Sequence, residues 1–373
     1  MSRFKCKNLI VGCGLSGITL AERIASKLGE DVIIIDRREH IGGNVYDYVD
    51  NCSGITVHKY GAHIFHTNDK EVWQYISRFT DWRRYMHHVK AYVDGKEIPI
   101  PFNLNSIRSV FSESLATNLE NKLIEKFGFN KKVPILKLRQ TGDADLHFLA
   151  QYVYEKVFLN YTLKQWGCRP EELNADVSER VPVYISRDDR YFQDTYQGIP
   201  EQGYTEMMRK MLNNPLIQVK LNHDFNKIRN EISSERLFYT GAIDEFFNYE
   251  LGALPYRSLD LVYKTHRCSY IQSESVINYP ENYDYTRSVE YKYFLDEKAD
   301  TTVVSYEYPC PYQDGINERY YPIPNEQNEL MYSKYKQMAQ KLDNVYFLGR
   351  LGDYKYYNMD QAVARALNLI KYI

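Results

Sequence analysis

A run of closely spaced glycines near the N-terminus offers backbone N–H groups to a phosphate. Residues 12–17 read GCGLSG, which is the spacing of a dinucleotide-binding turn. In such a turn Gly12 permits a tight bend, Gly14 lets the backbone approach a pyrophosphate, and Gly17 lets a helix pack closely. Asp36 follows about 20 residues on, where a carboxylate accepts hydrogen bonds from ribose hydroxyls.

The elements around this turn are those that a dinucleotide site needs. Residues 8–11 form a short β-favouring run, residues 18–27 have helical apolar spacing, and residues 31–36 have the pattern of a buried strand. The helix N-terminus adds N–H groups and a positive dipole. A glycine pattern alone is a weak signal, but here the strand, helix, strand and acid accompany it. They favour a dinucleotide site over an ordinary βαβ unit with a tight turn.

Residues 37–44 continue this unit with basic residues and a second glycine pair. The segment reads RREHIGGN, and it resembles the opening of the larger flavin-binding families. Plain nicotinamide dehydrogenases generally lack this continuation. Gly42 and Gly43 would let a second backbone segment close over the pyrophosphate, and Asn44 could donate to it.

His63 and His66 stand three residues apart in the segment KYGAHIFHT, residues 59–67. Such a pair can ligate a metal, but no carboxylate or cysteine lies nearby at ligand spacing. We therefore predict a loop beside the cofactor and no metal site. For either histidine alone, a hydrogen-bonded structural role is the simpler alternative.

Composition argues against several classes of partner. The chain has 373 residues and a net charge of −2, so we expect two or three structural units and neither nucleic acid nor a membrane surface as partner. No apolar run approaches the roughly 20 residues of a membrane span. Because the predicted first strand lies close to the N-terminus, we expect no signal peptide. The six cysteines are scattered, which predicts reduced thiols in the cytoplasm and no disulfide framework or structural zinc.

Tyrosine is unusually abundant, with 35 residues, many of them in polar neighbourhoods after Phe148. A tyrosine side chain combines a flat apolar face with a hydroxyl group. This combination suits a wet pocket for a sugar or nucleotide. An aromatic-rich core is the alternative.

The middle of the chain predicts inserted units. Residues 71–81 have a helical pattern, and residues 88–102 predict a hairpin that turns at Asp94-Gly95. Residues 103–170 lack strand signals, and their amphipathic windows predict a helical unit; these windows are 107–114, 117–127 and 145–158. Residues 126–140 within it are charged and partly irregular, and we expect a mobile connection there. Residues 160–167 should form the exit of a helix, where pocket walls are often built.

The second half of the chain returns to the dinucleotide sheet. Residues 219–221 and 237–241 predict two more of its strands, and residues 345–350 predict a last buried one. Between them, four segments predict an antiparallel sheet: 260–265, 275–278, 287–294 and 302–308. Helices are expected at 329–341 and 359–371, the latter with its N-terminus toward the cofactor.

These elements give an α/β fold with a discontinuous Rossmann-like FAD-binding domain, an inserted helical unit and an antiparallel β-sheet domain. The predicted boundaries are 1–76, 198–245 and 325–373 for the cofactor domain and 103–170 for the helical substrate-side domain. The sheet domain takes 77–102, 171–197 and 246–324.

Several motifs in fixed order resemble the bacterial UDP-galactopyranose mutase family. These flavoenzymes interconvert the pyranose and furanose forms of a nucleotide sugar. The resemblance runs nearly from end to end and rests on GCGLSG with HIGGN (40–44), KYGAHIFHT (59–67), NYTLKQWG (160–167), RVPV (180–183), RYFQDTYQGIPEQGYT (190–205), YTR (285–287), YYPIP (320–324) and LGRLGDYKYYNMDQA (348–362).

The resemblance implies FAD, active when reduced, as the cofactor. The residues implied to bind it are Gly12, Gly14, Leu15, Ser16, Asp36, Arg37, Gly43, Asn44, His63, Val219, Gly349, Arg350 and Met359. Val219 would lie near the adenine, Arg350 and Met359 near the isoalloxazine, and His63 beside the flavin N5.

The resemblance also implies a substrate site. The nucleotide would lie against Phe158, Tyr161, Thr162 and Trp166, with Asn278 nearby. Arg180 and Arg287 would hold the diphosphate, and Arg180 would arrive on a mobile loop. The remaining implied contacts are Tyr191, Tyr321, Arg350, Tyr356 and Asn358.

In such a mutase the nucleophile is the N5 atom of reduced FAD, which attacks the anomeric carbon and expels the nucleotide. The sugar opens through a flavin-iminium intermediate and closes through a different hydroxyl, with no net electron transfer. The catalytic residues implied are Arg180, Arg287 and His63, whose tasks are binding, alignment and electrostatics. The Asp188-Asp189 pair is interpreted as a loop turn and not as an acid–base pair. A cytoplasmic homodimer that serves cell-surface polysaccharide biosynthesis is also implied.

Two positions depart from the family pattern. Asn358 stands where mutases commonly have an aspartate, and His87 or His88 occupies a region where an asparagine often faces the sugar. UDP-galactopyranose is therefore the first substrate hypothesis, and dTDP-fucopyranose or UDP-N-acetylgalactosamine the alternative. A net FAD oxidoreductase and a non-catalytic nucleotide-sugar-binding protein are more distant alternatives.

Overall fold

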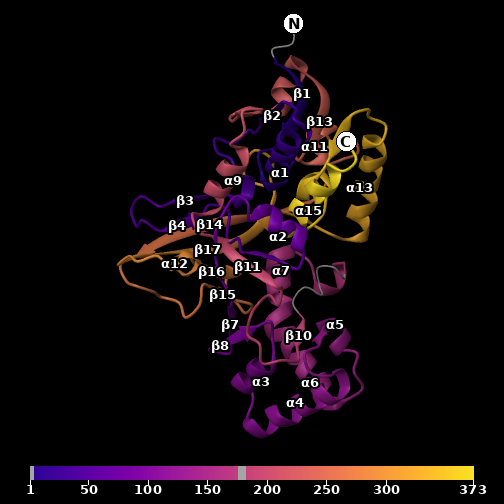
Figure 1. Cartoon of the computed structure of the whole chain (residues 1–373). Coiled ribbons are helices and arrows are strands. Elements are labelled where there is room, and N and C mark those ends of the chain that lie inside the picture. The colour runs from indigo at the N-terminus through magenta and orange to yellow at the C-terminus, as the bar shows by residue number, and fades with distance from the viewer. Residues whose placement is uncertain (1–3, 175–181) are drawn as a thin grey trace.

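The computed structural model describes residues 4–174 and 182–373 (Figure 1). A five-stranded parallel sheet holds the N-terminus, with the strand order β12-β2-β1-β13-β19. Its strands are β1 (Phe4–Val11), β2 (Val32–Ile35), β12 (Ile217–Lys220), β13 (Ile232–Tyr239) and β19 (Val345–Phe347). Since three distant stretches of the chain build one sheet, the predicted discontinuous Rossmann-like fold is confirmed.

Helix α1 (Leu15–Arg23) follows the glycine turn and continues as the π-helical segment η1 (Ile24–Leu28). Its buried apolar residues pack against α15 (Met359–Leu369) and α9 (Tyr204–Leu212). Helix α2 (Lys70–Ile76) packs against the other side of α15. The two ends of the chain therefore meet beside the glycine turn, as predicted.

A seven-stranded sheet has the order β18-β14-β17-β16-β15-β7-β8. Its strands are β7 (Val89–Val93), β8 (Lys96–Ile100), β14 (Tyr256–His266), β15 (Val276–Asn278), β16 (Arg287–Glu290), β17 (Thr302–Pro311) and β18 (Tyr321–Pro322). All pairs are antiparallel except β15 with β7, which is parallel because the hairpin docks onto the sheet from another part of the chain. The predicted hairpin turn is present, with positive φ at Asp94 (48°) and Gly95 (76°).

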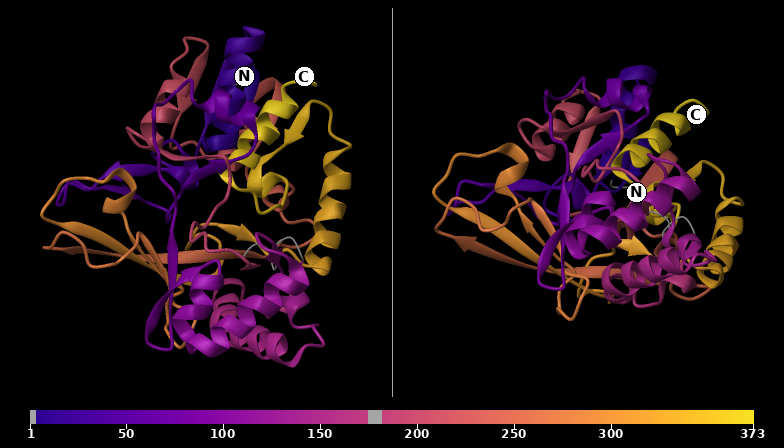
Figure 2. Two further views of the ribbon diagram at one scale, coloured as in Figure 1. Left: turned by 60° about the horizontal axis from the view of Figure 1, so that its bottom comes forward. Right: turned by 90° about the horizontal axis from the view of Figure 1, so that it is seen from below.

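A helical unit occupies the end of the molecule opposite the parallel sheet, and the seven-stranded sheet lies between them (Figures 1 and 2). It contains α3 (Leu104–Val110), α4 (Glu113–Phe127), α5 (Ile135–Leu138), α6 (Ala144–Val153), the π-helical η3 (Tyr154–Leu159) and α7 (Asn160–Trp166). The prediction of no strand in 103–170 was wrong at one place. There β9 (Lys132–Val133) pairs with β10 (Val183–Tyr184), so the segment 126–140 is less irregular than expected.

Three expected boundaries differ from the structure. The helix predicted over 71–81 ends at Ile76, and the indole Nε1 of Trp82 donates to Oγ of Ser77 across the following turn at 2.8 Å. The strand predicted over 287–294 ends at Glu290, and the chain turns into α12 (Lys292–Leu295) to bury Phe294. Strand β19 is a partly exposed edge strand, and Gly349 already begins α14 (Gly349–Gly352).

Short elements connect these layers. They are η2 (Gly43–Val45), β3 (Asp47–Val49), β4 (Thr56–His58), β5 (Phe65–Thr67), β6 (Trp82–Arg83), η4 (Pro170–Glu172), β11 (Tyr196–Pro200), α10 (Phe225–Ile228), η5 (Arg229–Glu231), α11 (Ile243–Phe246) and α13 (Glu326–Ala339). One apolar core runs from the parallel sheet through the hairpin into the helical unit. Of the helices in the described residues, none has the length and apolar character that crossing a bilayer requires. The three-domain division stays a prediction.

Candidate active site

The glycine turn joins β1 to α1 so tightly that side chains would not fit. Gly12 has a φ of +104°, and a Cβ there would lie 2.0 Å from Oγ1 of Thr240. A Cβ on Gly17 would lie 2.0 Å from the carbonyl oxygen of Gly12, so only glycine lets α1 pack this closely. Gly43 crosses the turn, since a Cβ there would lie 3.0 Å from Cα of Gly14.

Helix α1 presents its N-terminus to a cleft above this turn. No side chain caps the first turn of the helix, and Leu15 and Ser16 both line the cleft. The first N–H groups of a helix have no intrahelical partner, and the helix dipole favours an anion there. An uncapped helix N-terminus beside close-packed glycines fits the pyrophosphate of a dinucleotide.

Asp36 closes the cleft at the end of β2. Its carboxylate accepts from the backbone N–H of Cys13 at 2.7 Å and from that of Arg38 at 2.9 Å. The two bonds fix the carboxylate at the rim of the cleft, where the sequence predicts a partner for ribose hydroxyls.

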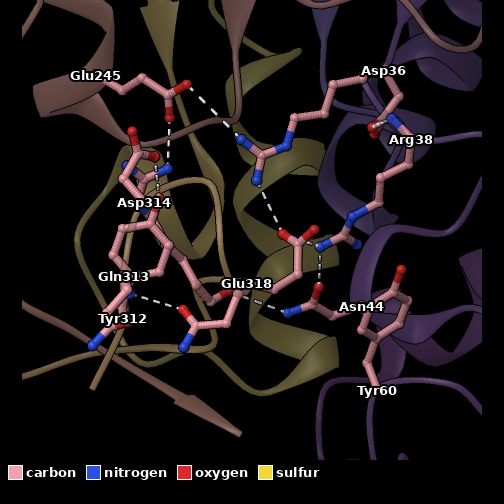
Figure 3. Close-up of polar contacts among 12 residues, drawn as sticks. Asp36, Arg38, Asn44, Tyr60, Glu245, Tyr312, Gln313, Asp314 and Glu318 are labelled. Atoms are coloured by element: carbon pink, nitrogen blue, oxygen red, sulfur yellow. Dashed lines mark hydrogen bonds and ion pairs between the residues drawn. The ribbon is translucent and has the colours of Figure 1, made fainter. Parts of the chain in front are cut away.

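Charged residues of the β17–β18 loop lie at the same rim of the cleft (Figure 3). Glu318 on this loop pairs with Arg37 at 3.0 Å and with Arg38 at 2.7 Å. Arg38 also donates to Oδ1 of Asn44 at 2.9 Å, and Nδ2 of Asn44 donates to the carbonyl oxygen of Arg319 at 3.4 Å. The loop of the seven-stranded sheet is thereby tied to both dinucleotide motifs.

The cleft brings together nearly all the predicted cofactor residues. Those that line it are Gly12, Gly14, Leu15, Ser16, Asp36, Arg37, Gly43, Asn44, His63, Gly349, Arg350 and Met359. Val219 does not line it; this residue lies on the edge strand β12, where it pairs with Ile34 of β2. The loop after that strand takes its place, with His223, Asp224 and Phe225 at the cleft.

A second set of residues lines the cleft that the sequence analysis did not identify. Thr240, Gly241 and Ala242 follow β13, and Glu245 and Arg319 form an ion pair at 2.6 Å. Residues 240–242 could have been anticipated, because parallel strands end at a common sheet edge. The ion pair could not, since it joins distant loops.

His63 lies where the cleft meets a second, central cavity. Its Nδ1 donates to the carbonyl oxygen of Gly61 at 2.8 Å, which fixes the tautomer because a carbonyl only accepts. Burial lowers the pKa of His63 to about 3, and the charges of His58, Arg350 and Arg287 act in the same direction. His63 is therefore a neutral imidazole whose Nε2 can accept a hydrogen bond.

The central cavity holds most of the predicted substrate residues. These are Tyr161, Trp166, Tyr191, Asn278, Arg287, Tyr321, Arg350, Tyr356 and Asn358. An aromatic wall forms part of it, with ring centroids of Trp166 and Tyr356 5.6 Å apart and those of Tyr321 and Tyr356 5.1 Å apart. The Arg350 guanidinium lies over both tyrosine rings, at 5.4 and 5.2 Å from their centroids.

Arg287 provides a buried cation in this cavity. Its Nε donates to Oε2 of Glu307 at 2.5 Å, and the Glu307 side chain is only 1% exposed. Burial opposes the charge, but Glu307 outweighs that effect and raises the pKa of Arg287 above its ordinary value. No hydrogen bond joins the Nη atoms to another described residue, so both can bind an anion.

A third, mostly apolar cavity opens from the central one. It contains the predicted Phe158, Tyr161, Thr162, Trp166, Tyr191 and Asn278, together with Ala91, Ile100, Val157, Pro170, Leu173 and Pro280, which the sequence did not indicate. A flat base fits such a pocket, since aromatic and apolar faces bind a base by stacking.

The two departures from the family pattern both fall at the central cavity. Asn358 is the N-cap residue of α15, and its backbone N–H donates to Oε1 of Gln361 at 2.9 Å. Asparagine and aspartate serve about equally well as N-caps, so the helix tolerates either. His87 lines the cavity, whereas His88 does not and instead bridges to Arg190.

Arg180, the second predicted diphosphate residue, lies outside the described residues. Within the described ranges no cluster of His, Cys, Asp and Glu has the composition of a metal site. His66 instead pairs with Asp194 at 2.6 Å. Asp188 pairs with Arg190 at 2.7 Å and Asp189 accepts from Asn103 at 2.8 Å, so both serve the loop.

Comparison with known proteins agrees with this geometry. A family model described as UDP-galactopyranose mutase matches residues 156–356, and one described as an NAD(P)-binding Rossmann-like domain matches residues 10–79. A probable UDP-galactopyranose mutase of Klebsiella pneumoniae is 36% identical, over 96% of this chain and 92% of its own. The dTDP-fucopyranose mutase of Escherichia coli is also 36% identical, over 97% and 96% of the two chains.

Solved structures with the same fold include a reduced UDP-galactopyranose mutase, with a TM-score of 0.74, 14% identity and coverage of 98% and 93%. A putative protoporphyrinogen oxidase from Exiguobacterium has a TM-score of 0.64, 14% identity and coverage of 100% and 98%. At 14% identity these structures show the fold alone. The sequence relatives at 36% identity and the family model show the family. The chain belongs to the UDP-galactopyranose mutase family.

Proposed function

We propose that this protein interconverts UDP-galactopyranose and UDP-galactofuranose. As a member of its family the chain is an isomerase that exchanges the pyranose and furanose forms of a nucleotide sugar. The choice of UDP-galactose within that class is our proposal, and so are the residue roles that follow.

The observation that carries the proposal is the continuity of the three cavities. The cofactor cleft and the central cavity share His63, Arg350 and Met359, and the central and apolar cavities share Tyr161 and Trp166. A dinucleotide on the glycine turn and a nucleotide in the apolar cavity would therefore meet in the central cavity. A nucleotide sugar whose base occupied the apolar cavity would extend its diphosphate and sugar into the central cavity.

The cofactor cleft fits FAD, whose reduced isoalloxazine supplies a nucleophilic nitrogen for attack on an anomeric carbon. The protein's own residues bind and orient. Arg350 donates to the carbonyl oxygens of Tyr320 and Tyr357 at 3.1 and 2.6 Å, which fixes its guanidinium at the boundary of the cleft and the central cavity. His63 remains uncharged there and can accept one hydrogen bond.

Arg287 would hold the diphosphate that leaves the anomeric carbon. A charge-assisted hydrogen bond contributes about 1.5–3 kcal/mol, and a guanidinium can form two to one phosphate. Trp166 and Phe158 would stack on or enclose the base, and Asn278 would hydrogen-bond to it. The resemblance to the mutase family implies that Arg180 adds a second guanidinium.

A dTDP-fucopyranose substrate is the second candidate, because a carboxylate is missing at Asn358. A substrate site that lacks a charged partner for one hydroxyl fits a deoxy sugar better. The relative that acts on dTDP-fucopyranose is as similar as the UDP-galactopyranose relative, at 36% identity in both cases. We further propose a cytoplasmic homodimer that supplies a furanose for cell-surface polysaccharide, which light scattering and subcellular fractionation would test.

The experiment is to incubate the dithionite-reduced protein separately with UDP-galactofuranose and dTDP-fucofuranose and to follow pyranose formation by chromatography. We expect conversion of the UDP sugar at the higher kcat/KM. Conversion of the dTDP sugar alone would make the second candidate correct, and conversion of neither would refute both.

A further inference from the structure

The ε-ammonium group of Lys164 lies within a ring of backbone carbonyl groups beside the apolar cavity. Nζ donates to the carbonyl oxygens of Tyr279, Glu281, Tyr283 and Tyr285, at 2.5, 3.1, 3.0 and 3.1 Å. An ammonium group has three N–H donors, so the ring satisfies all of them. No carboxylate of the described residues forms an ion pair with it.

The carbonyl ring is the loop that joins β15 to β16. Asn278 ends β15 and lies opposite Arg287, which begins β16. The N–H of Tyr279 donates to the carbonyl oxygen of Thr286 at 2.8 Å and closes the loop next to this pair. Since every second carbonyl from 279 to 285 points to Lys164, the loop backbone wraps around the ammonium. The positions of Asn278 and Arg287 therefore depend on the ring.

Lys164 belongs to α7, the helix whose Tyr161 and Trp166 line both the central and the apolar cavity. It lies on this helix between Tyr161 and Trp166, and Arg257 holds the C-terminal end of the helix. The Arg257 guanidinium donates to the carbonyl oxygens of Lys164 and Gln165, both at 2.9 Å. These bonds satisfy orphan carbonyls at the helix C-terminus and complement its dipole. The Lys164 side chain can therefore hold the loop in a fixed relation to the helix.

We propose that Lys164 is a positioning residue for the nucleotide sugar, which joins the α7 wall of the cavity to the β15–β16 hairpin through the carbonyl ring. The ligand's identity rests on the proposed function, but the joining of the two walls does not. Burial lowers the pKa of Lys164 to about 8, with Asp284 acting in the opposite direction, so the ammonium is charged at neutral pH. The ring binds a cation, and potassium is also bound by backbone carbonyls in proteins.

Lys164→Met tests the positioning role, because methionine keeps an unbranched side chain of similar length and removes the positive charge. We expect the Kd for UDP and the KM to rise about tenfold or more, as charge-assisted hydrogen bonds are lost, while kcat changes less than about threefold. Bound FAD should be retained, since its cleft is built by other elements. Hydrogen exchange of residues 279–287 should accelerate, and this readout needs no ligand.

Lys156→Met is the matched control. Its Nζ also bonds to the same loop, through Oε1 of Glu281 at 3.1 Å, but it lies at the exposed rim and outside the carbonyl ring. We expect its UDP affinity to stay within about twofold of wild type, as exposed ion pairs contribute little.

Lys164→Ala opens the ring and permits rescue by an added cation. Potassium or methylammonium should restore UDP affinity at least severalfold at constant ionic strength, whereas tetramethylammonium, which has no N–H donor and is larger, should not. Wild-type affinity in Lys164→Met, an equal loss in Lys156→Met, or the absence of any rescue would overturn the proposal. A wild-type protein that binds UDP but converts no nucleotide sugar would instead refute the proposed function alone.

Discussion

Glu307 holds Arg287 through one carboxylate oxygen, with 2.5 Å between Oε2 and Nε, and leaves its other oxygen without a hydrogen bond from any described residue. That free Oε1 lies 3.1 Å from the place where a Cβ on Gly61 would be, and Gly61 in turn holds the His63 ring. The carboxylate thus lies between the buried cation and the histidine loop. Glu307 thereby holds the Arg287 guanidinium through Nε, and Arg287 lines the central cavity.

Arg287→Ala should abolish most activity without loss of FAD. Arg287 and the substrate diphosphate would form a buried charge pair, and truncating one member of such a pair costs about 2–5 kcal/mol of binding free energy. We therefore expect kcat/KM to fall at least about 30-fold. Steady-state kinetics with the reduced protein and the flavin absorbance spectrum measure the two effects. Arg209→Ala, on the exposed face of α9, is the control and should match wild type. Normal turnover in Arg287→Ala would remove this residue from the diphosphate site.

Trp166→Ala should weaken nucleotide binding. Its indole lines both the central and the apolar cavity, and stacking of a base on an aromatic ring contributes about 1–3 kcal/mol. Calorimetric titration with UDP should therefore give a Kd raised about fivefold or more. Phe148→Ala, which removes an exposed aromatic ring from the same helical unit, should leave the Kd unchanged. Equal affinities in the Trp166 variant and wild type would show that the base binds elsewhere.

Gly17→Ala should yield a protein that does not retain FAD. The added Cβ would lie 2.0 Å from the Gly12 carbonyl oxygen, so α1 must move away from β1 and carry its N-terminus with it. Such overpacking also costs about 1–3 kcal/mol of stability. Flavin content and thermal unfolding are the measurements. Gly142→Ala is the matched control, because its Cβ would meet no atom within 4 Å. A fully loaded Gly17→Ala protein would contradict the phosphate cradle.

The His66–Asp194 pair should stabilise the fold at neutral pH and lose this contribution in acid. The hydrogen bond from His66 lowers the pKa of Asp194 below its ordinary 3.8, against the opposing effect of burial. A carboxyl group whose pKa is lower in the native state stabilises the fold above its ordinary pKa, and this contribution is lost as the pH falls through the native pKa. The melting temperature of wild type should therefore exceed that of Asp194→Asn at about pH 5, with the gap closing as the pH falls below 3.8.

The same comparison with Asp300→Asn, which alters an exposed carboxylate, should show no such gap. A wild-type advantage that stayed constant down to pH 3 would mean that the carboxylate charge of Asp194 is not what stabilises this loop.

Sequence patterns predicted this fold correctly where a structural feature depends on only a few neighbouring residues. The glycine spacing, the Asp94-Gly95 turn and the helix exit at Gly167 each reflect one backbone conformation, and all three are present. Strand β16 was predicted too long, since only tertiary packing makes the chain turn at Tyr291 and bury Phe294.

The candidate site was predictable where motifs mark it, and less so where distant loops meet. Motif residues such as Gly12, His63 and Trp166 line the cavities, whereas Val219, which belongs to no motif segment and lies on the edge strand β12, does not. The partners that hold the site, such as Glu307 and Glu318, carry no sequence signature of their roles, and the motif that contains Lys164 does not indicate the carbonyl groups it binds. Their partners lie far away along the chain, so only the folded arrangement shows the pairings.

The proposed isomerisation is tested most directly by the number of substrate turnovers per reducing equivalent. The protein would be reduced with one equivalent of dithionite under anaerobic conditions, mixed with excess UDP-galactofuranose, and followed by chromatography and flavin absorbance together. Many UDP-galactopyranose molecules should form per flavin while the flavin stays reduced, because an isomerisation consumes no electrons. Consumption of only one equivalent of substrate, reduced to another product as the flavin becomes oxidised, would show net redox chemistry and contradict the proposed function.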